Sequence, residues 1–473
     1  MLYIAAFVTI VIIIRNTEST SKALAYTFLV ILYPVLGMII YFSLGINYRS
    51  RKIYSKKLVV DNNSFPELEV RLGKFSEEML LKNREHLKHF FRLAHLKNLE
   101  NLLTVRNSTD LLINGEQKFE EVLQSLKTAK HHIHIEYYIY EEIGIGQEIA
   151  EILKTKAEEG VQVRFIYDDF GSQGISRGFV RSLKKSGVEV FPFYKLWWHL
   201  FTTRINYRNH RKIIVVDGTV GYVGGINVSD RYVNTNENYG FWRDTHLRIE
   251  GSAVLLLQRV FLADWNFCSD QNIGVSPDFF PRIDLSKEPV SRQIVQIVAS
   301  GPDSDHPDIM YSMMQAIILA KEEVLITTPY FVPEKGIINA LKIAKLSGVK
   351  VKLLVPGKSD SKVVNIVSKS FYGELLDIGV EIYRYEKGFV HAKTMVCDNL
   401  LSMIGTANFD QRSFELNFEI NALIFDEAFS SKLRGAFYKD LQGAKRISRE
   451  KWEKRSHISK IAERTLRLFA PLI

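Results

Sequence analysis

The chain has 473 residues, of which 46% are apolar, enough for a large hydrophobic core divided over two or three domains. Its formal net charge of +9 indicates an anionic partner, either nucleic acid or a membrane rich in acidic lipid. Only two cysteines are present, Cys268 and Cys397, which excludes a disulfide framework, and neither has zinc-ligand spacing.

The N-terminus favours a membrane over nucleic acid. Residues 23–46 carry no charged side chain and are long enough to cross a hydrocarbon core of roughly 30 Å, so we predict a transmembrane helix despite Pro34 and Gly37. The apolar run 2–14 is short for a span. It is expected to form a hairpin with the second span or, alternatively, to lie at the interface or re-enter the membrane. Residues 1–57 are therefore predicted to be a membrane anchor.

A basic cluster after this segment predicts its orientation. By the positive-inside rule it places the rest of the chain in the cytoplasm, and its charges would also contact anionic headgroups. The cluster comprises Arg49, Arg51, Lys52, Lys56 and Lys57. Residues 58–105 then mix charges with Leu and Phe at helical spacing, which predicts a helical adaptor.

Strands and helices alternate in the remainder of the chain. Strands are predicted at 132–140 and 161–169 around a helix at 146–159, and this order recurs as strands at 323–332 and 349–355 around a helix at 337–346. Strand, helix, strand in succession implies a mixed α/β sheet with right-handed crossovers. We therefore expect an α/β fold with halves at 106–270 and 291–446, a linker at 271–290, and a basic amphipathic tail at 447–473.

One motif occurs twice in matching contexts. It reads NHRKIIVVDGTVGYVGGIN at 209–227 and VHAKTMVCDNLLSMIGTAN at 390–408. The shared residues are His210, Lys212, Asp217, Gly224 and Asn227 in the first copy and His391, Lys393, Asp398, Gly405 and Asn408 in the second. A single H-x-K-x4-D run is weak evidence, but two copies with matching offsets indicate a duplicated unit.

The duplicated residues suit the chemistry of a phosphodiester. Residues two apart in a strand face the same side, so one ligand can touch both the histidine and the lysine of a motif. If the halves pack with pseudo-two-fold symmetry, His210 and His391 share a pocket, where one imidazole attacks phosphorus and the other protonates the departing alkoxide. The two lysines and the two asparagines would bind the phosphate, and no metal or other cofactor is then required.

A carboxylate is expected to orient each imidazole through its second nitrogen. Asp244 and Glu419 each precede an alternating strand downstream of a motif, and we propose them for this role. Asp217 and Asp398 lie beyond a run of apolar strand positions, which favours a structural role over direct catalysis.

Two further runs have alternative interpretations. Asp168 and Asp169 could bind a metal, although a carboxylate pair beside glycines is more typical of a turn. Trp197 and Trp198, in the aromatic run 194–201, are either ordinary core residues or an interfacial rim at the headgroups.

The paired motifs resemble those of the phospholipase D superfamily, and the chain as a whole resembles its bacterial cardiolipin synthases. The resemblance rests on YPVLGMIIYFSLG, NHRKIIVVDG with GGIN, FLADW, TPYFVP, FVHAKTMVCD, GTANFDQRSFELNFE and RLFAPLI. It implies transmembrane helices followed by two pseudo-symmetric phospholipase D-like halves with mixed sheets, and condensation of two phosphatidylglycerol molecules to cardiolipin and glycerol through a phosphatidyl-histidine. The matching catalytic-motif residues are His210, Lys212, Asp217, His391, Lys393 and Asp398.

The superfamily pattern also makes the first-motif histidine the nucleophile. Bare backbone at Gly224 and Gly225 would admit a phosphatidyl group, and the hydroxyl of Thr406 could assist the alkoxide, so His210 is assigned as nucleophile and His391 as general acid and then base.

The resemblance leaves two other activities open. A phospholipase D hydrolase that releases phosphatidic acid would use the same residues, whereas a superfamily nuclease would leave the apolar segment unexplained. The expected partners are phosphatidylglycerol and cardiolipin in an anionic cell membrane of a bacterium, without nucleic acid. The sequence implies no particular oligomeric state.

Overall fold

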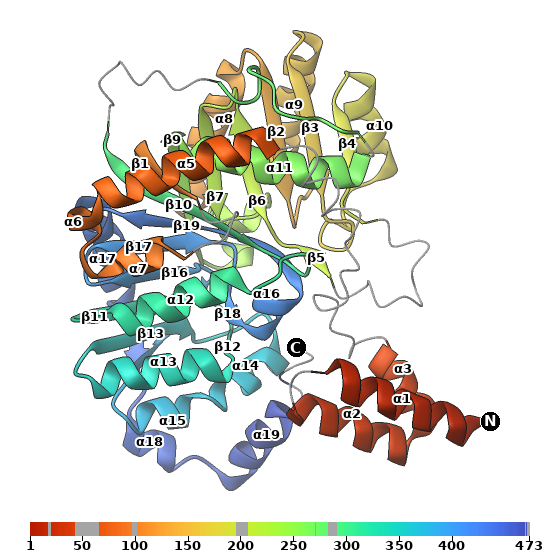
Figure 1. Ribbon diagram of the computed structural model, residues 1–473, viewed down its shortest axis with the longest axis vertical. Helices are drawn as coiled ribbons and strands as arrows, with labels where there is room; N and C mark the ends of the chain where they lie inside the picture. The colour runs from red at the N-terminus through yellow and green to blue at the C-terminus, as the bar shows by residue number, and fades with distance from the viewer. Residues whose placement is uncertain are drawn as a thin grey trace.

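The structure is a computed structural model that describes residues 1–17, 20–42, 66–96, 102–194, 207–269, 271–281, 291–468 and 470. One mixed sheet runs through most of the molecule, with helices on both of its faces (Figure 1). Within the described residues this sheet has 16 strands in the order β20-β14-β13-β11-β16-β17-β19-β10-β1-β9-β7-β6-β2-β3-β4, and β5 pairs with β19 beside that path.

The first half of the chain supplies one end of the sheet. Its elements are β1 (Leu103–Ile113), α8 (Asn114–Thr128), β2 (His132–Tyr137), α9 (Ile145–Glu158), β3 (Gln162–Tyr167), α10 (Arg177–Lys185), β4 (Glu189–Pro192), β5 (Arg208–Asn209), β6 (Lys212–Val216), β7 (Val220–Gly224), β8 (Trp242–Arg243), β9 (Thr245–Gly251) and α11 (Ala253–Ser269).

The elements of the second half supply the other end and follow a similar succession, with several short ones added. They are β10 (Gln293–Ser300), α12 (Asp308–Leu319), β11 (Glu323–Thr327), β12 (Phe331–Val332), α13 (Lys335–Leu346), β13 (Lys350–Pro356), α14 (Lys362–Lys369), α15 (Tyr372–Leu376), β14 (Glu381–Tyr385), β15 (Phe389–Val390), β16 (Thr394–Cys397), β17 (Leu401–Gly405), β18 (Phe409–Asp410), α16 (Gln411–Glu415), β19 (Asn417–Phe425), α17 (Glu427–Leu441) and β20 (Ala444–Arg446).

The halves meet where β1 and β10 pair antiparallel, with Leu103 opposite Gln296. From this junction the strand order β10-β19-β17-β16-β11-β13-β14 mirrors the order β1-β9-β7-β6-β2-β3-β4. The prediction of two pseudo-symmetric α/β halves with mixed parallel and antiparallel pairing is therefore confirmed. The halves share one continuous sheet, because the edge strand of the first half, β1, pairs with the edge strand of the second half, β10.

The strands beside the motifs are buried on both faces. In β6, Ile213 and Val215 belong to the buried cluster that contains side chains of α11, whereas Ile214 and Val216 belong to the cluster on the opposite face that contains side chains of α8 and α9. These runs therefore read as continuously apolar in the sequence, as expected for strands covered on both sides. The predicted helix at 146–159 is confirmed as α9, and the predicted helix at 337–346 as α13.

Residues 66–94 of the predicted helical adaptor form the helices α5 (Pro66–Lys82), α6 (Arg84–Leu87) and α7 (Phe91–Ala94). Helix α5 packs against β1 of the first half, and α7 packs against α12 of the second. Leu87, Phe90 and Leu93 are buried in the same cluster as Ile309 of α12. The apolar face of these helices therefore packs on the hydrophobic cluster that contains α12.

The N-terminal helices correct one expectation. In place of a continuous helix over 23–46, α2 (Thr20–Leu32) ends at Tyr33, whose φ and ψ of −135° and 74° are not helical, and α3 (Pro34–Ile40) begins at the proline. The residue before a proline is disfavoured in the α conformation, which explains the break. A Cβ at Gly37 would lie 2.6 Å from the Val30 backbone, so glycine permits the two helices to pack closely.

The first apolar run forms α1 (Leu2–Asn16), which packs with α2 and α3 around Ile13, Val30 and Tyr41. Figure 1 shows these three short helices as a group beside the main body. In the described part of the chain no helix is both long enough and apolar enough to cross a membrane. The prediction of N-terminal transmembrane helices is therefore wrong.

Some predicted segments lie outside the described residues: the basic cluster at 49–57, Trp197 and Trp198, and residues 282–290 of the predicted linker. The predicted C-terminal tail contains α18 (Arg449–Glu453) and α19 (His457–Arg467). Helix α19 packs against α14, and Ile458 and Ile461 on its outer face are exposed.

Candidate active site

Each motif histidine follows a two-residue strand that pairs with the opposite half. Strand β5 pairs in parallel with the start of β19, and β15 pairs in parallel with β8. The backbone N–H of His210 donates to the Phe418 carbonyl at 3.0 Å, and that of His391 donates to the Arg243 carbonyl at 2.7 Å. Each histidine is therefore held by backbone from the other half.

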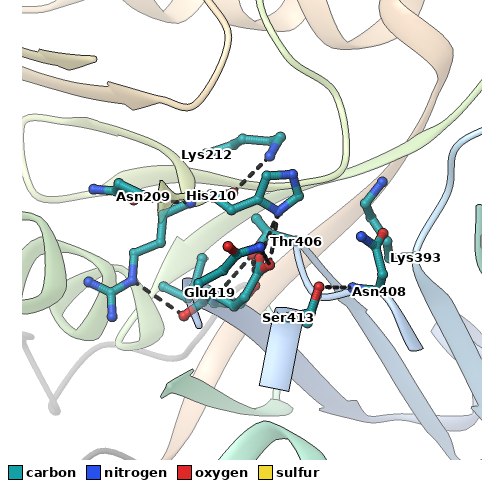
Figure 2. A network of polar contacts seen from close by, with 12 residues as sticks. Asn209, His210, Lys212, Lys393, Thr406, Asn408, Ser413 and Glu419 are labelled. Atoms are coloured by element: carbon teal, nitrogen blue, oxygen red, sulfur yellow. Dashed lines mark hydrogen bonds and ion pairs between the residues drawn. The ribbon is translucent and has the colours of Figure 1, made fainter. Parts of the chain in front are cut away.

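This exchange brings each imidazole to a carboxylate of the opposite half. Glu419 Oε2 lies 2.9 Å from His210 Nδ1, and Asp244 Oδ2 lies 2.7 Å from His391 Nδ1. Both carboxylates are fully buried. Figure 2 shows the first pair, with Glu419 directly below the His210 ring. Asp244 and Glu419, proposed from the sequence as orienting carboxylates, thus each contact the motif histidine of the opposite half.

Asp244 and Glu419 occupy corresponding places in the duplicated fold. Gly224 pairs with His246 between β7 and β9, and Gly405 pairs with Asn421 between β17 and β19. Each carboxylate stands two residues before that paired position. The sequence gives no direct sign of this equivalence, because the residues around Asp244 and Glu419 differ.

Burial governs the ionisation of both histidines. It lowers the pKa of His210 to about 4, although Glu419 opposes the drop. Burial, followed by the charge of Lys393, also lowers the pKa of His391, against the opposing effect of Asp244. Burial disfavours ionised Glu419, but His210 and Lys212 outweigh it and lower the pKa of Glu419 to about 2. The resting His210 is therefore neutral and hydrogen-bonded to an ionised carboxylate.

The two motif lysines are also buried beside the histidines. Lys212 Nζ donates to the His210 carbonyl at 2.7 Å, and Lys393 Nζ donates to the His391 carbonyl at 2.7 Å and lies 3.0 Å from His391 Nε2. Burial lowers the pKa of Lys212 to about 7 and that of Lys393 to about 8. A bound phosphate would restore their positive charge, because an anion stabilises the ammonium form.

Both histidines line one pocket of about 350 Å³, together with Asn227 and Asn408. Asn227 Nδ2 donates to the Tyr232 hydroxyl at 2.9 Å, and the backbone N–H of Asn408 donates to Ser413 Oγ at 3.1 Å. Asn408 Oδ1 is buried and has no hydrogen-bond partner among the described residues. The pocket therefore gathers two imidazoles, two amides and two nearby ammonium groups around a space suited to one phosphodiester.

Asp217 and Asp398 lie at the far ends of β6 and β16 from the histidines. Asp217 accepts from the backbone N–H groups of Lys130, His131 and His132 at 2.8–2.9 Å. Asp398 likewise accepts from the N–H groups of the three residues 321–323 and contacts His89 Nε2 at 2.7 Å. Neither aspartate lines the pocket. Each fixes the start of a neighbouring strand, so these two members of the motif contribute no group to the pocket.

Asp168 forms a turn. Its Oδ1 accepts from the N–H groups of Phe170 and Gly171 at 3.0 and 2.8 Å, and its Oδ2 accepts from the Asn209 N–H at 2.9 Å. Through Asn209 it helps to hold the strand that precedes His210. Both carboxylate oxygens of Asp168 thus accept hydrogen bonds from backbone N–H groups, which is typical of a turn and not of a metal ligand.

None of the three positions used to assign the histidine roles, Gly224, Gly225 and Thr406, lines the pocket, and a Cβ at Gly224 would lie 2.6 Å from the Cα of His246. A Cβ at Gly225 would lie 2.2 Å from Asp244 Oδ1, so this glycine admits the carboxylate and not a substrate. The Thr406 hydroxyl accepts from the Ile420 N–H at 2.9 Å and is fully buried. Gly225 makes room for Asp244, and the Thr406 side chain hydrogen-bonds with Glu419. These positions therefore give no support to the assignment of His210 as nucleophile.

Sequence reasoning missed the aromatic wall of the pocket and two buried ion pairs. The Tyr138 ring lies 4.8 Å from the His210 ring, and the Trp242 ring lies 5.9 Å from the His391 ring. The Arg211–Asp264 pair also contacts the Glu419 carbonyl, and the Arg243–Asp440 pair contacts the Asp244 carbonyl. The Asp of FLADW, Asp264, was a usable signal, because a charge inside an apolar helix requires a buried partner.

Comparison with known proteins identifies the family of the chain. Residues 122–265 and 313–441 match the family model described as "Cardiolipin synthase, PLD-like domain". A protein named cardiolipin synthase from Halalkalibacterium halodurans is 41% identical over 99% of this chain and 92% of its own length. Cardiolipin synthase 2 from Bacillus anthracis is 40% identical over 99% of this chain and 90% of its own length.

A solved structure shares the fold at low sequence identity. The crystal structure of phosphatidylserine synthase from Haemophilus influenzae Rd KW20 superposes with a TM-score of 0.56 and 14% identity, covering 77% of this chain and 93% of that one. At this identity the likeness concerns the fold alone.

Proposed function

Because the chain belongs to the phospholipase D-like family of cardiolipin synthases, which are phosphatidyltransferases, we propose that it condenses two phosphatidylglycerol molecules into cardiolipin and glycerol. The observation that supports this most is the crossed arrangement of two histidine–carboxylate pairs at one pocket. One phosphorus atom can then meet a nucleophile on one side and a proton donor on the other.

The first half-reaction forms a phosphatidyl-histidine. His210 is neutral at rest and bonded through Nδ1 to Glu419, which leaves Nε2 free to attack phosphorus. The phosphorus–oxygen bond to glycerol breaks as the phosphorus–nitrogen bond forms. Asp244 opposes the fall in the pKa of His391 and so favours the protonated imidazole, which gives its proton to the departing alkoxide, and glycerol leaves.

The second half-reaction returns the enzyme to its starting state. The glycerol hydroxyl of a second phosphatidylglycerol loses its proton to His391, and its oxygen attacks phosphorus. The phosphorus–nitrogen bond breaks, which releases His210 and cardiolipin. Lys212 and Lys393 bind the non-bridging oxygens, and Asn227 and Asn408 donate hydrogen bonds, so that the five-coordinate transition state is stabilised without a metal. Asp217 and Asp398 act structurally in this proposal, through the backbone that they hold.

We place the enzyme at the bacterial cell membrane, with its catalytic body on the cytoplasmic side. Apolar side chains on the outer faces of α1, α2 and α3 are exposed and would contact lipid. They include Tyr3, Ile4, Phe7, Ile14, Phe28, Ile31, Leu32 and Ile39. The basic residues at 49–57 would be attracted to anionic lipid, which is enriched in the cytoplasmic leaflet.

The test supplies phosphatidylglycerol to the membrane-reconstituted protein and resolves cardiolipin, phosphatidic acid and glycerol. Cardiolipin and glycerol in equal amounts are expected. Phosphatidic acid without cardiolipin would show a hydrolase, because water would then be the acceptor at the same residues. Cleavage of nucleic acid without lipid turnover would show a nuclease.

A further inference from the structure

The wall of the pocket beside His391 carries a carboxylate that the proposed chemistry does not use. Asp360 lies in the loop between β13 and α14, lines the pocket and remains accessible to solvent. Tyr330, which follows β11, lines the pocket next to it, and its hydroxyl donates to Asp360 Oδ2 at 2.6 Å. Burial, followed by the charge of Asp360, raises the pKa of Tyr330 well above its usual value, so the phenol keeps this proton.

Asp360 lines the same pocket as His391, and its charge acts on groups beside that histidine. The Tyr232 ring is 5.8 Å from the His391 ring, and burial raises the pKa of Tyr232, with Asp360 adding to the rise. Burial lowers the pKa of Lys393, and Asp360 is one of the carboxylates that oppose this drop. Its negative charge therefore reaches both neighbours of the imidazole that faces the leaving group.

The other two carboxylates of the pocket have strong donors already. Glu141 is ion-paired with Arg231 at 2.8 Å and accepts from Ser229 Oγ at 2.7 Å. Asp410 accepts from the Ser413 N–H at 2.7 Å as the cap of α16. Asp360 differs, since its hydrogen-bond partners in the described part of the chain are hydroxyls, namely Tyr330 and, at 3.3 Å, Ser359 Oγ.

A carboxylate in this place favours one kind of ligand. Phosphate is repelled by the charge of Asp360 and is attracted to the lysines, so the space beside Asp360 suits the alcohol part of a substrate better than its phosphate. Hydroxyl groups donate strong hydrogen bonds to a carboxylate, and adjacent hydroxyls can use both of its oxygens. The alcohol that leaves from phosphorus, or attacks it, must lie beside His391 if that residue is the acid and base.

We propose that Asp360, held by Tyr330, binds the free hydroxyls of the glycerol headgroup and selects polyols as leaving group and acceptor. This inference rests on the proposed function, in which glycerol departs and a glycerol hydroxyl attacks beside His391. Asp360 takes no part in bond breaking. It decides which alcohol is presented to the phosphatidyl-histidine.

The experiment is a competition between acceptors. The full chain in mixed micelles of phosphatidylglycerol receives isotopically labelled glycerol, ethanol and ethanolamine at equal concentrations, and mass spectrometry measures the three phosphatidyl products. The ratio of labelled phosphatidylglycerol to phosphatidylethanol does not depend on how much of a variant is folded. Wild-type protein should favour glycerol, because ethanol offers no second hydroxyl to Asp360.

Asp360→Asn should lower the glycerol-to-ethanol ratio by about tenfold or more, as expected for loss of a hydrogen bond to a charged acceptor. Tyr330→Phe leaves every charge of the pocket in place and should lower the ratio in the same direction by a smaller factor. Glu141→Gln is the matched control, because it neutralises a pocket carboxylate that Arg231 and Ser229 already occupy, and it should leave the ratio unchanged.

Three results would overturn the proposal: an unchanged ratio in Asp360→Asn, an equal fall in Glu141→Gln, or a loss confined to ethanolamine, which would mean that Asp360 attracts a cation. The wild-type products test the proposed function separately. Wild-type protein that forms phosphatidic acid but no cardiolipin would contradict the synthase, whereas wild-type protein that forms cardiolipin beside an unaltered ratio in Asp360→Asn would contradict only the role of Asp360.

Discussion

Asp244, in the first half of the chain, accepts a hydrogen bond from His391, in the second half, at 2.7 Å. Glu419 and His210 form the converse pair at 2.9 Å. Neither half therefore contains a complete histidine–carboxylate pair, although each contains a complete copy of the motif. The duplication yields one centre and not two, because β5 and β15 each cross to pair with the opposite half.

The crossed carboxylates predict matched losses of activity. Asp244→Asn and Glu419→Gln should each lower turnover by about a hundredfold or more, since an amide can favour the wrong imidazole tautomer and does not stabilise an imidazolium. Turnover is measured per folded molecule, with folding followed by circular dichroism. Glu250→Gln, on strand β9 directly after Asp244 but ion-paired with Arg248, is the control and should retain activity. Near-normal turnover in either carboxylate variant would show that these contacts serve packing alone.

The strands around the motifs could be predicted because burial on both faces makes them continuously apolar in the sequence, as for Ile213 and Ile214 in β6. The sequence also selected Asp244 and Glu419, which lie just before β9 and near the start of β19, the strands that pair with the motif strands β7 and β17. It could not show which carboxylate meets which histidine. That choice depends on β8 and β5, two-residue strands with no periodic pattern to detect.

The N-terminal prediction failed for a different reason. Mean hydropathy over residues 23–46 is insensitive to a single backbone break, and Tyr33 leaves the helical conformation in front of Pro34. The resulting helices are short enough to pack on one another around Val30 and Tyr41. Pro34 and Gly37 were visible in the sequence and were the signals for this break.

The buried lysines predict opposite effects of pH on stability and on substrate binding. Burial lowers the pKa of Lys212 to about 7 and that of Lys393 to about 8, whereas a lysine in the unfolded chain titrates near 10.4. Between these values the unfolded chain binds more protons than the folded one, so the free energy of unfolding should rise from about pH 7 to about pH 10. Affinity for the anionic lipid should fall over the same range, because the neutral amine no longer attracts phosphate.

Lys212→Met and Lys393→Met test this relationship. Each variant should unfold at a higher temperature than wild-type protein at pH 7, with a smaller difference at pH 10, because it removes a buried titrating group. Each should also lose about a hundredfold or more in turnover, like an enzyme that loses an oxyanion donor. Lower stability at pH 7 in both variants would mean that the two lysines stabilise the fold and are not there mainly to bind an anion.

Substitution of the motif aspartates should lower the stability of the protein without lowering its turnover. Asp217 and Asp398 have φ of 52° and 53°, a conformation that asparagine tolerates, so Asn replaces each with little strain. Asp217→Asn weakens acceptance from three backbone N–H groups and should lower the free energy of unfolding by about 1–3 kcal/mol. Turnover per folded molecule should stay close to that of the wild type. Urea unfolding and turnover measured on the same preparation check both, and a large loss of turnover at unchanged stability would reassign Asp217 to catalysis.

Activity should survive exhaustive chelation, because two lysines and two asparagines already neutralise and bind the phosphate. The measurement compares turnover before and after EDTA treatment and dialysis, in detergent micelles of constant lipid composition, since divalent ions also bind anionic lipid. Complete loss that is restored by a metal ion would point to Asp168 and Asp169 as ligands. That result would also require Asp168 to release the backbone N–H groups that it holds at 2.8–3.0 Å.

The last prediction concerns the roles of the two histidines. His210→Ala and His391→Ala should each abolish conversion of phosphatidylglycerol, because both residues act on the same phosphorus atom. A donor with a good leaving group needs no general acid, so His391→Ala should still form a covalent phosphatidyl adduct on His210, whereas His210→Ala should form none. The neutral resting state of His210, with a pKa of about 4, suits a nucleophile. Mass spectrometry of peptides from each trapped variant decides the assignment: an adduct on His391 in the His210 variant, with none on His210 in the other, would reverse it and move the leaving alcohol away from Asp360.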